Sequence, residues 1–227
     1  MPFSDLHDRV AVVNERIREA ADRGGHGQRV RIVAVTKTHS VEAVRAALDA
    51  GIQDVGENRI QEALGKIEEH ATPAARWHLL GHLQRNKVKF LEPFHMVHSL
   101  DSTRIAESID SWAVSRGTCV NVLLQVNVSG EDTKGGFLPE AVAGAARGLR
   151  SMKGLKVCGV MTMAPYEAPE RTLREVFSGA REARDVLLSE GHPAEELSMG
   201  MSGDYEIAVE EGATMVRLGT ILFGARS

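Results

Sequence analysis

The sequence is poor in the features that define several large classes of protein. Only two of its 227 residues are cysteines, Cys119 and Cys158, and they lack metal-ligand spacing, so we expect both to be reduced core residues. The formal net charge of −4 lacks the basic excess of a general nucleic-acid binder. No apolar run is long enough to cross a bilayer, and the first residues contain no apolar segment of a signal peptide. These absences favour a cytoplasmic protein that binds neither nucleic acid nor membrane.

What the chain does contain is an alternation of strand-like and helix-like segments. A first helix is expected from Ser4 to Arg23, with Ser4 or Asp5 as its cap. Strand-like runs then begin near Arg31, Gln53, Arg76, His95, Val120, Leu155, Leu197 and Thr214. Helical stretches are expected over roughly 41–50, 57–70, 84–91, 102–116, 138–150, 170–190 and 203–211, with a short turn near 221–224. Eight such units without a linker predict one domain over 1–227, an α/β (β/α)8 TIM barrel with an extra N-terminal helix; a doubly wound open sheet is the alternative.

Lys37 is the residue that most strongly indicates chemistry. It ends the apolar, β-branched run that starts at Ile32, so its stem would lie in an apolar wall and its amine at the mouth of a barrel. Desolvation there disfavours the ammonium form, which suits a lysine that forms Schiff bases. The simpler interpretation is a lysine that ends a strand and reaches into water.

Two glycine-containing segments follow the seventh and eighth predicted strands. They contain Ser202 with Gly203, and Gly219 with Thr220, and each opens a predicted helix. In barrels of this class the loops after these two strands commonly bind phosphate, because glycine allows close approach and helix N-termini offer N–H groups. Tight turns without a ligand are the alternative.

Other candidate residues have weaker patterns. Arg217 lies in the last strand, where its guanidinium would either face an acceptor such as a ring nitrogen or pair with a strand carboxylate such as Glu57. His78 and His82 have a zinc-like spacing but no third ligand, so we expect no metal site. Lys134 lies on a glycine-rich loop and is expected to be solvated.

Seven ordered segments of the chain together resemble the pyridoxal phosphate homeostasis protein family, whose fold is similar to the N-terminal barrel of alanine racemase. The segments are Val33–Lys37, Gly56–Glu62, Trp77–Lys87, His98–Ser102, Gln125–Val128, Gly159–Met163, and a closing pair made of Leu197–Ser202 with Val216–Thr220. They span nearly the whole chain, and Gly203 is a variable position of the family.

The resemblance implies a site for pyridoxal 5′-phosphate (PLP). Lys37 would hold PLP as an internal aldimine, and Ser202 with the backbone of Gly219 and Thr220 would bind the phosphate. Arg217 would face the pyridine nitrogen. The surroundings of the ring would be lined by Asn58, His82 and Met201.

The resemblance also bears on catalysis. An arginine partner cannot protonate the ring nitrogen, so PLP would be a weak electron sink. Alanine racemase takes a second acid/base, a tyrosine, from a separate domain, and this chain ends shortly after its eighth predicted strand, with only Tyr166 and Tyr205 available. We therefore expect a monomeric PLP carrier or reservoir in vitamin B6 and amino-acid homeostasis, possible donor to PLP-requiring apo-enzymes, without assigned catalytic residues. The alternatives are a weak PLP enzyme acting on amino acids, with His82 as proton donor, and a PLP-free Schiff-base aldolase on a sugar phosphate. A secondary PLP site, for example at Lys134, stays open.

Overall fold

The computed structural model describes residues 3–70, 74–131 and 134–224, and eight parallel strands form a closed barrel in it. The strands are β1 (Arg31–Val35), β2 (Asp54–Glu57), β3 (Arg76–Leu79), β4 (Phe94–Leu100), β5 (Val120–Gln125), β6 (Leu155–Met161), β7 (Glu196–Ser198) and β8 (Met215–Leu218). Each strand pairs with the next in the chain, and β8 pairs with β1, which closes the barrel. The predicted (β/α)8 fold is confirmed, and the open sheet is ruled out.

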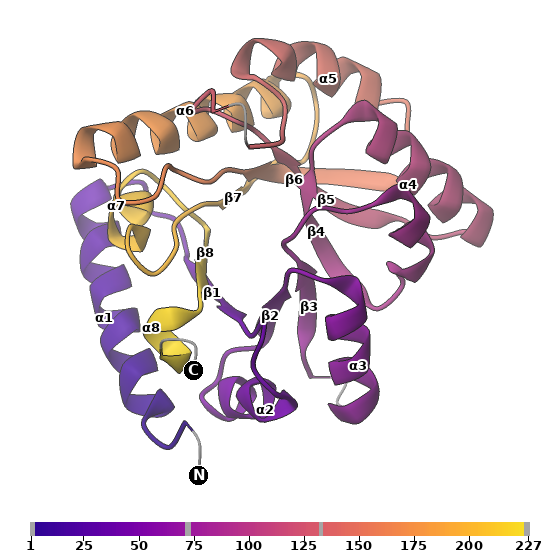
Figure 1. The fold of residues 1–227 in the computed structure, drawn as a ribbon. Coiled ribbons are helices and arrows are strands. Elements are labelled where there is room, and N and C mark those ends of the chain that lie inside the picture. The colour runs from indigo at the N-terminus through magenta and orange to yellow at the C-terminus, as the bar shows by residue number, and fades with distance from the viewer. Residues whose placement is uncertain (1–2, 71–73, 132–133, 225–227) are drawn as a thin grey trace.

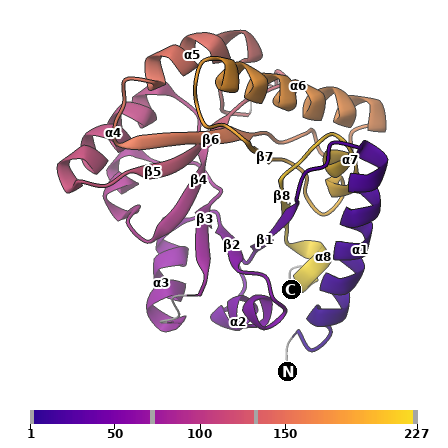
Figure 2. The same cartoon turned by 180° about the vertical axis from the view of Figure 1, so that it is seen from behind.

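Helices surround the barrel on the outside, as Figure 1 and the opposite view in Figure 2 show. They are α1 (Leu6–Gly24), α2 (Val41–Asp49), α3 (Ile60–His70), η1 (Arg85–Phe90), α4 (Thr103–Arg116), η2 (Pro139–Ala141), α5 (Val142–Leu149), α6 (Glu170–Ser189), α7 (Tyr205–Glu210) and α8 (Thr220–Phe223). The segment expected as a helix over 84–91 is the 3-10 helix η1, and the one over 138–150 is divided into η2 and α5.

The N-terminal helix α1 lies along α7 and α8, so it joins the last part of the chain (Figure 1). Its apolar stripe includes Leu6 and Ile17, which are buried, and Arg9 donates to the carbonyl oxygen of Leu222 at 3.0 Å. Asp5 precedes the helix, but its side chain makes no capping bond and instead accepts from Arg9. The helix ends where Gly25 adopts a left-handed conformation with φ of 66°, as glycine does readily.

Two apolar clusters form the core. The larger one lies between the strands and the surrounding helices. The smaller one fills the barrel interior and consists of Val33, Met96, Leu123, Cys158, Met161 and Met215. These inward-pointing side chains make much of the barrel interior apolar. Functional groups in such barrels are placed at the strand ends.

One prediction about the cysteines was wrong. Cys158 is buried, but Cys119 is exposed because it lies in the connection between α4 and β5, one residue before the strand begins at Val120. Within the described part of the chain, no helix is both long and apolar enough to cross a membrane.

Candidate functional site

A cavity of about 550 Å³ opens at the carboxyl end of the barrel strands. Seven of the eight residues expected at the site line this cavity: Lys37, Asn58, Met201, Ser202, Arg217, Gly219 and Thr220. They come from segments that follow β1, β2 and β7, from β8 itself, and from the start of α8. The parallel barrel brings them together although the first and last are separated by most of the chain.

The backbone around Lys37 is held by side chains from α3. Thr38, the next residue, has a φ of 67°, which is unusual for a β-branched residue, and its N–H donates to Glu62 Oε1 at 2.5 Å. On the other side of Lys37, the carbonyl oxygen of Thr36 accepts from Lys66 Nζ at 2.8 Å. Lys37 therefore leaves the strand between two tethered neighbours.

A buried ion pair lies beside this strand end. Glu57 is fully buried, and its Oε1 accepts from Lys66 Nζ and from the Thr36 hydroxyl, each at 2.6 Å. Burial raises the pKa of Glu57, although the bonds from Lys66 and Thr36 act in the opposite direction. Glu57, which the sequence offered as a partner for Arg217, is therefore bonded to Lys66 instead. Lys66 was missed in the sequence, because its spacing of four from Glu62 is typical of an exposed helical ion pair.

Arg217 forms part of the cavity wall, and only 6% of its surface is exposed. Its Nη1 donates to the carbonyl oxygen and the hydroxyl of Ser198, at 2.6 and 2.7 Å, and its Nη2 donates to the carbonyl oxygen of Thr162 at 2.9 Å. Burial lowers the pKa of Arg217 to about 10, so the guanidinium is still charged at neutral pH. A guanidinium has five N–H donors, so these bonds leave two for an acceptor in the cavity.

The two glycine-containing turns meet on the cavity wall. The hydroxyl of Ser202 accepts from the N–H of Ile221 at 3.3 Å, which joins the turn after β7 to the start of α8. The Met201 N–H donates to Asp204 Oδ1 at 2.6 Å. A side chain added at Gly203 would meet no atom within 4 Å, so there is room beside Ser202. Hydroxyl and backbone donors next to open space suit a phosphate group.

Apolar side chains and one tyrosine complete the cavity. Leu80, which follows β3, lines it together with Met161 and Met163, at and just after the end of β6. These side chains offer apolar surface to the faces of a flat ring. Tyr166 and Glu167 lie in the loop between β6 and α6, and Tyr166 is 87% exposed. Tyr166 was not predicted at the site, because a loop position carries no signal of direction.

Two other residues differ from expectation. His82 is not among the residues that line the cavity: its side chain is 64% exposed and its Nδ1 lies 2.7 Å from Asp101 Oδ2. Lys134 was expected to be solvated, but its side chain is only 21% exposed, because it forms an ion pair with Glu131 and its Nζ lies 3.4 Å from the carbonyl oxygen of Met163.

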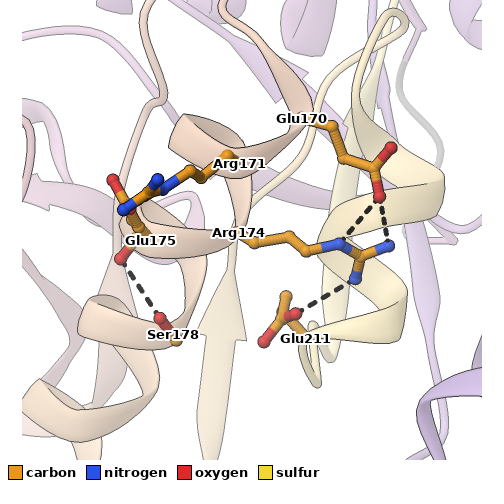
Figure 3. Close-up of a pocket in the computed structure, with 6 residues that line it drawn as sticks. All are labelled: Glu170, Arg171, Arg174, Glu175, Ser178 and Glu211. Atoms are coloured by element: carbon orange, nitrogen blue, oxygen red, sulfur yellow. Dashed lines mark hydrogen bonds and ion pairs between the residues drawn. The ribbon is translucent and has the colours of Figure 1, made fainter.

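A second hollow, on the outer surface of α6, has a different character (Figure 3). The guanidinium of Arg174 points toward Glu170 and Glu211 there and also bonds Glu210. Its positive charge is therefore neutralised by carboxylates of the chain itself. The hollow contains no counterpart of the lysine and the turns that line the barrel cavity.

Comparison with known proteins identifies a family for the chain. Residues 10–227 match the family described as alanine racemase, N-terminal domain. A protein of Aquifex aeolicus named pyridoxal phosphate homeostasis protein is 41% identical over 222 residues, which cover 96% of this chain and 97% of the relative. A protein of the same name from Pseudomonas aeruginosa is 41% identical over 226 residues, covering 99% and 97%.

Solved structures give the same class. PipY of Synechococcus elongatus with PLP bound is 34% identical, with a TM-score of 0.86 over 96% of this chain and all of that one. An alanine racemase of Clostridium difficile is 18% identical, with a TM-score of 0.73 over 93% of this chain but 56% of that chain, which is a likeness of fold alone. The fold and the site thus define a barrel of the alanine racemase N-terminal class. Within that class, the chain belongs to the pyridoxal phosphate homeostasis protein family.

Proposed function

We propose that the barrel cavity binds PLP and that Lys37 is the residue to which the aldehyde of PLP attaches. The observation that carries the proposal is the convergence of an amine, a buried guanidinium and two hydroxyl-bearing turns in one cavity of about 550 Å³. Each group has a matching part on the cofactor: an aldehyde, a ring nitrogen and a phosphate. Relatives at 34–41% identity named for PLP, and PipY with PLP bound, support this assignment.

When bound, PLP would supply an electrophilic aldehyde and a ring able to delocalise charge. The chain's own residues would hold it rather than activate it. Arg217 keeps its proton at neutral pH and can only donate, so it would leave the ring nitrogen unprotonated. Ser202 and Thr220 would orient the phosphate, and Lys37 would fix the aldehyde end.

This donor set favours a carrier or reservoir that keeps PLP from reacting with other amines. In that role the chain would act in PLP and amino-acid homeostasis, as a cytoplasmic monomer that exchanges PLP with apo-enzymes. The cavity is open to solvent at Tyr166, which gives a route for exchange.

The test is to add PLP to purified protein and follow visible absorbance after extensive dialysis. The wild type should retain a yellow band at one equivalent, and Lys37→Ala should lose it. Lys153→Ala, a change at an exposed lysine, serves as the matched control and should behave as the wild type. A wild type that stays colourless would reject the assignment and favour the PLP-free aldolase, which would be assayed with sugar phosphates.

A second candidate function, weak catalysis on amino acids, is supported by one observation. Tyr166 and Glu167 line the cavity, and a tyrosine hydroxyl is a possible acid/base. Exchange of the α-hydrogen of amino acids with deuterated water, measured by NMR, separates the two functions. The carrier predicts exchange no faster than with free PLP, whereas faster exchange that Tyr166→Phe abolishes would establish the enzyme.

A further inference from the structure

A chain of five polar side chains crosses the apolar interior of the barrel and ends at Arg217. Its members, in order, are Asp54, His78, His98, Ser198 and Arg217. The distances are 2.8 Å from Asp54 Oδ1 to His78 Nε2 and 2.8 Å from His78 Nδ1 to His98 Nε2. His98 Nδ1 lies 2.9 Å from Ser198 Oγ, which accepts from Arg217 Nη1 at 2.7 Å.

This hydrogen-bonded series of side chains connects the two ends of the barrel. Asp54 is the first residue of β2 and lies at the amino end, beside Arg31 and Arg76, while Arg217 lines the cavity at the carboxyl end. His78, His98 and Ser198 come from β3, β4 and β7 and are fully buried. Buried polar groups of this kind are costly unless every one is bonded, so each member of the series needs its neighbours.

The two ends fix the direction of every hydrogen bond. Arg217 can only donate, so the Ser198 hydroxyl accepts from it and, among the described residues, has His98 Nδ1 as the acceptor for its own hydrogen. At the other end, burial alone would raise the pKa of Asp54, but bonds from His78 and Arg76 outweigh it, and that pKa lies well below its usual value. The ionised carboxylate only accepts, so His78 Nε2 carries a hydrogen.

Both ends therefore require the same tautomer in both histidines. Because His98 Nδ1 accepts from Ser198, the neutral His98 ring carries its hydrogen on Nε2 and donates it to His78 Nδ1, which is therefore bare. Burial is the largest cause that lowers the pKa of His98 well below its usual value, which agrees with a neutral ring. In the reversed direction, the hydroxyl hydrogen of Ser198 would point at the guanidinium, placing donor against donor.

We propose that Ser198, His98 and His78 are positioning residues for Arg217, anchored by Asp54, in a chain with a single hydrogen-bond direction. The hydrogen-bonded series occupies Nη1 of the Arg217 guanidinium through Ser198 and so determines which N–H donors face the cavity. As a statement about PLP this rests on the proposed function, because the acceptor that those donors meet is the ring nitrogen of the ligand. The tautomers of the histidines, by contrast, are a property of the protein alone.

Long-range proton–nitrogen correlation NMR of the imidazole rings tests the direction without PLP. At about pH 7, the wild type should show hydrogen on Nε2 and a bare Nδ1 in both His78 and His98. Hydrogen on Nδ1 of either ring, or on both nitrogens, would overturn the proposal. This measurement needs no variant, so it does not depend on a substituted chain folding.

Two substitutions of His98 test the coupling to the cavity. Glutamine has an amide donor and a carbonyl acceptor that can replace Nε2–H and Nδ1 in the same direction, whereas leucine has neither. We expect His98→Leu to weaken PLP binding about tenfold, and His98→Gln to restore most of it. Equal PLP affinity in wild type and His98→Leu would overturn the coupling, as would equal losses in both variants, which would indicate a packing role. If the wild type fails to bind PLP, the proposed function fails. The NMR result still tests the direction of the hydrogen bonds from Asp54 to Arg217.

Discussion

The ammonium group of Lys66 lies 2.8 Å from the carbonyl oxygen of Thr36. Lys66 belongs to α3 and Thr36 directly follows β1, so a helix holds the strand end from which Lys37 enters the cavity. The same ammonium bonds Glu57 Oε1 at 2.6 Å and Glu62 Oε1 at 3.1 Å. All three of its donors are used within the protein, which explains how a lysine only 7% exposed is accommodated.

Removing Lys66 should destabilise the barrel and disturb the site. Lys66→Met leaves the buried Glu57 without its cation, and breaking such a pair costs about 3 kcal/mol. Denaturant unfolding would measure this loss of free energy. The double variant with Glu57→Gln should lose less than the sum of the two single variants, because the uncompensated charge is gone. Additive losses would contradict the ion pair as the cause.

Gly81 allows the loops after β2 and β3 to meet. A side chain added there would overlap the carbonyl oxygen of Asn58, whose side chain lines the cavity. Gly81→Ala should therefore cost about 2 kcal/mol of stability and weaken PLP binding. Gly65→Ala is the matched control: it lies exposed in α3 with open space around it, and alanine there should stabilise by about 0.5–1 kcal/mol. Unchanged stability and binding in Gly81→Ala would show that the loops move apart freely.

The barrel and the site could be predicted from the sequence in large part, whereas Lys66 could not. The alternation of strands and helices predicted the barrel, because eight short apolar runs separated by amphipathic segments have few other solutions. The rule that strand ends share one mouth placed Lys37, Ser202 and Arg217 together. Lys66 was not predicted, because its pattern on a helix is that of a solvated residue and its burial depends on a neighbouring strand.

The interior hydrogen-bond network and the position of His82 were also not predicted from the sequence. The sequence indicated no partner for His78, yet it bonds Asp54 and His98, which come from two other strands. Contacts across a barrel depend on register and stagger, which local sequence does not reveal. His82 was expected at the site from the resemblance, but its ring bonds Asp101 outside the cavity lining.

Acid should destabilise the protein through His98. Burial lowers its pKa in the folded state, so below the ordinary histidine pKa the unfolded chain binds a proton that the folded ring does not. Stability due to this group is therefore present above that pKa and falls as the pH decreases, with a limiting slope of about 1.4 kcal/mol per pH unit. Unfolding free energies between about pH 7 and 5 should show a shallower slope in His98→Gln. Parallel slopes in the two proteins would contradict a buried neutral His98.

The Ser202 hydroxyl should contribute to phosphate binding. Ser202→Ala is expected to weaken PLP binding about tenfold, because it removes a hydrogen bond to a charged group. Pyridoxal, which lacks the phosphate, is the internal control and should bind both proteins equally. An equal loss for both ligands would place the effect of Ser202 in the fold of the turn, where it accepts from Ile221, rather than in phosphate recognition.

The central claim is that Lys37 is the attachment point for PLP, and reduction followed by peptide mapping tests it most directly. Protein loaded with one equivalent of PLP is treated with borohydride, digested and analysed by mass spectrometry. The account predicts the reduced pyridoxyl group on the peptide that contains Lys37, and no labelled peptide at that stoichiometry from Lys37→Ala. Label found instead on Lys134, or spread over surface lysines with Lys37 unmodified, would contradict it.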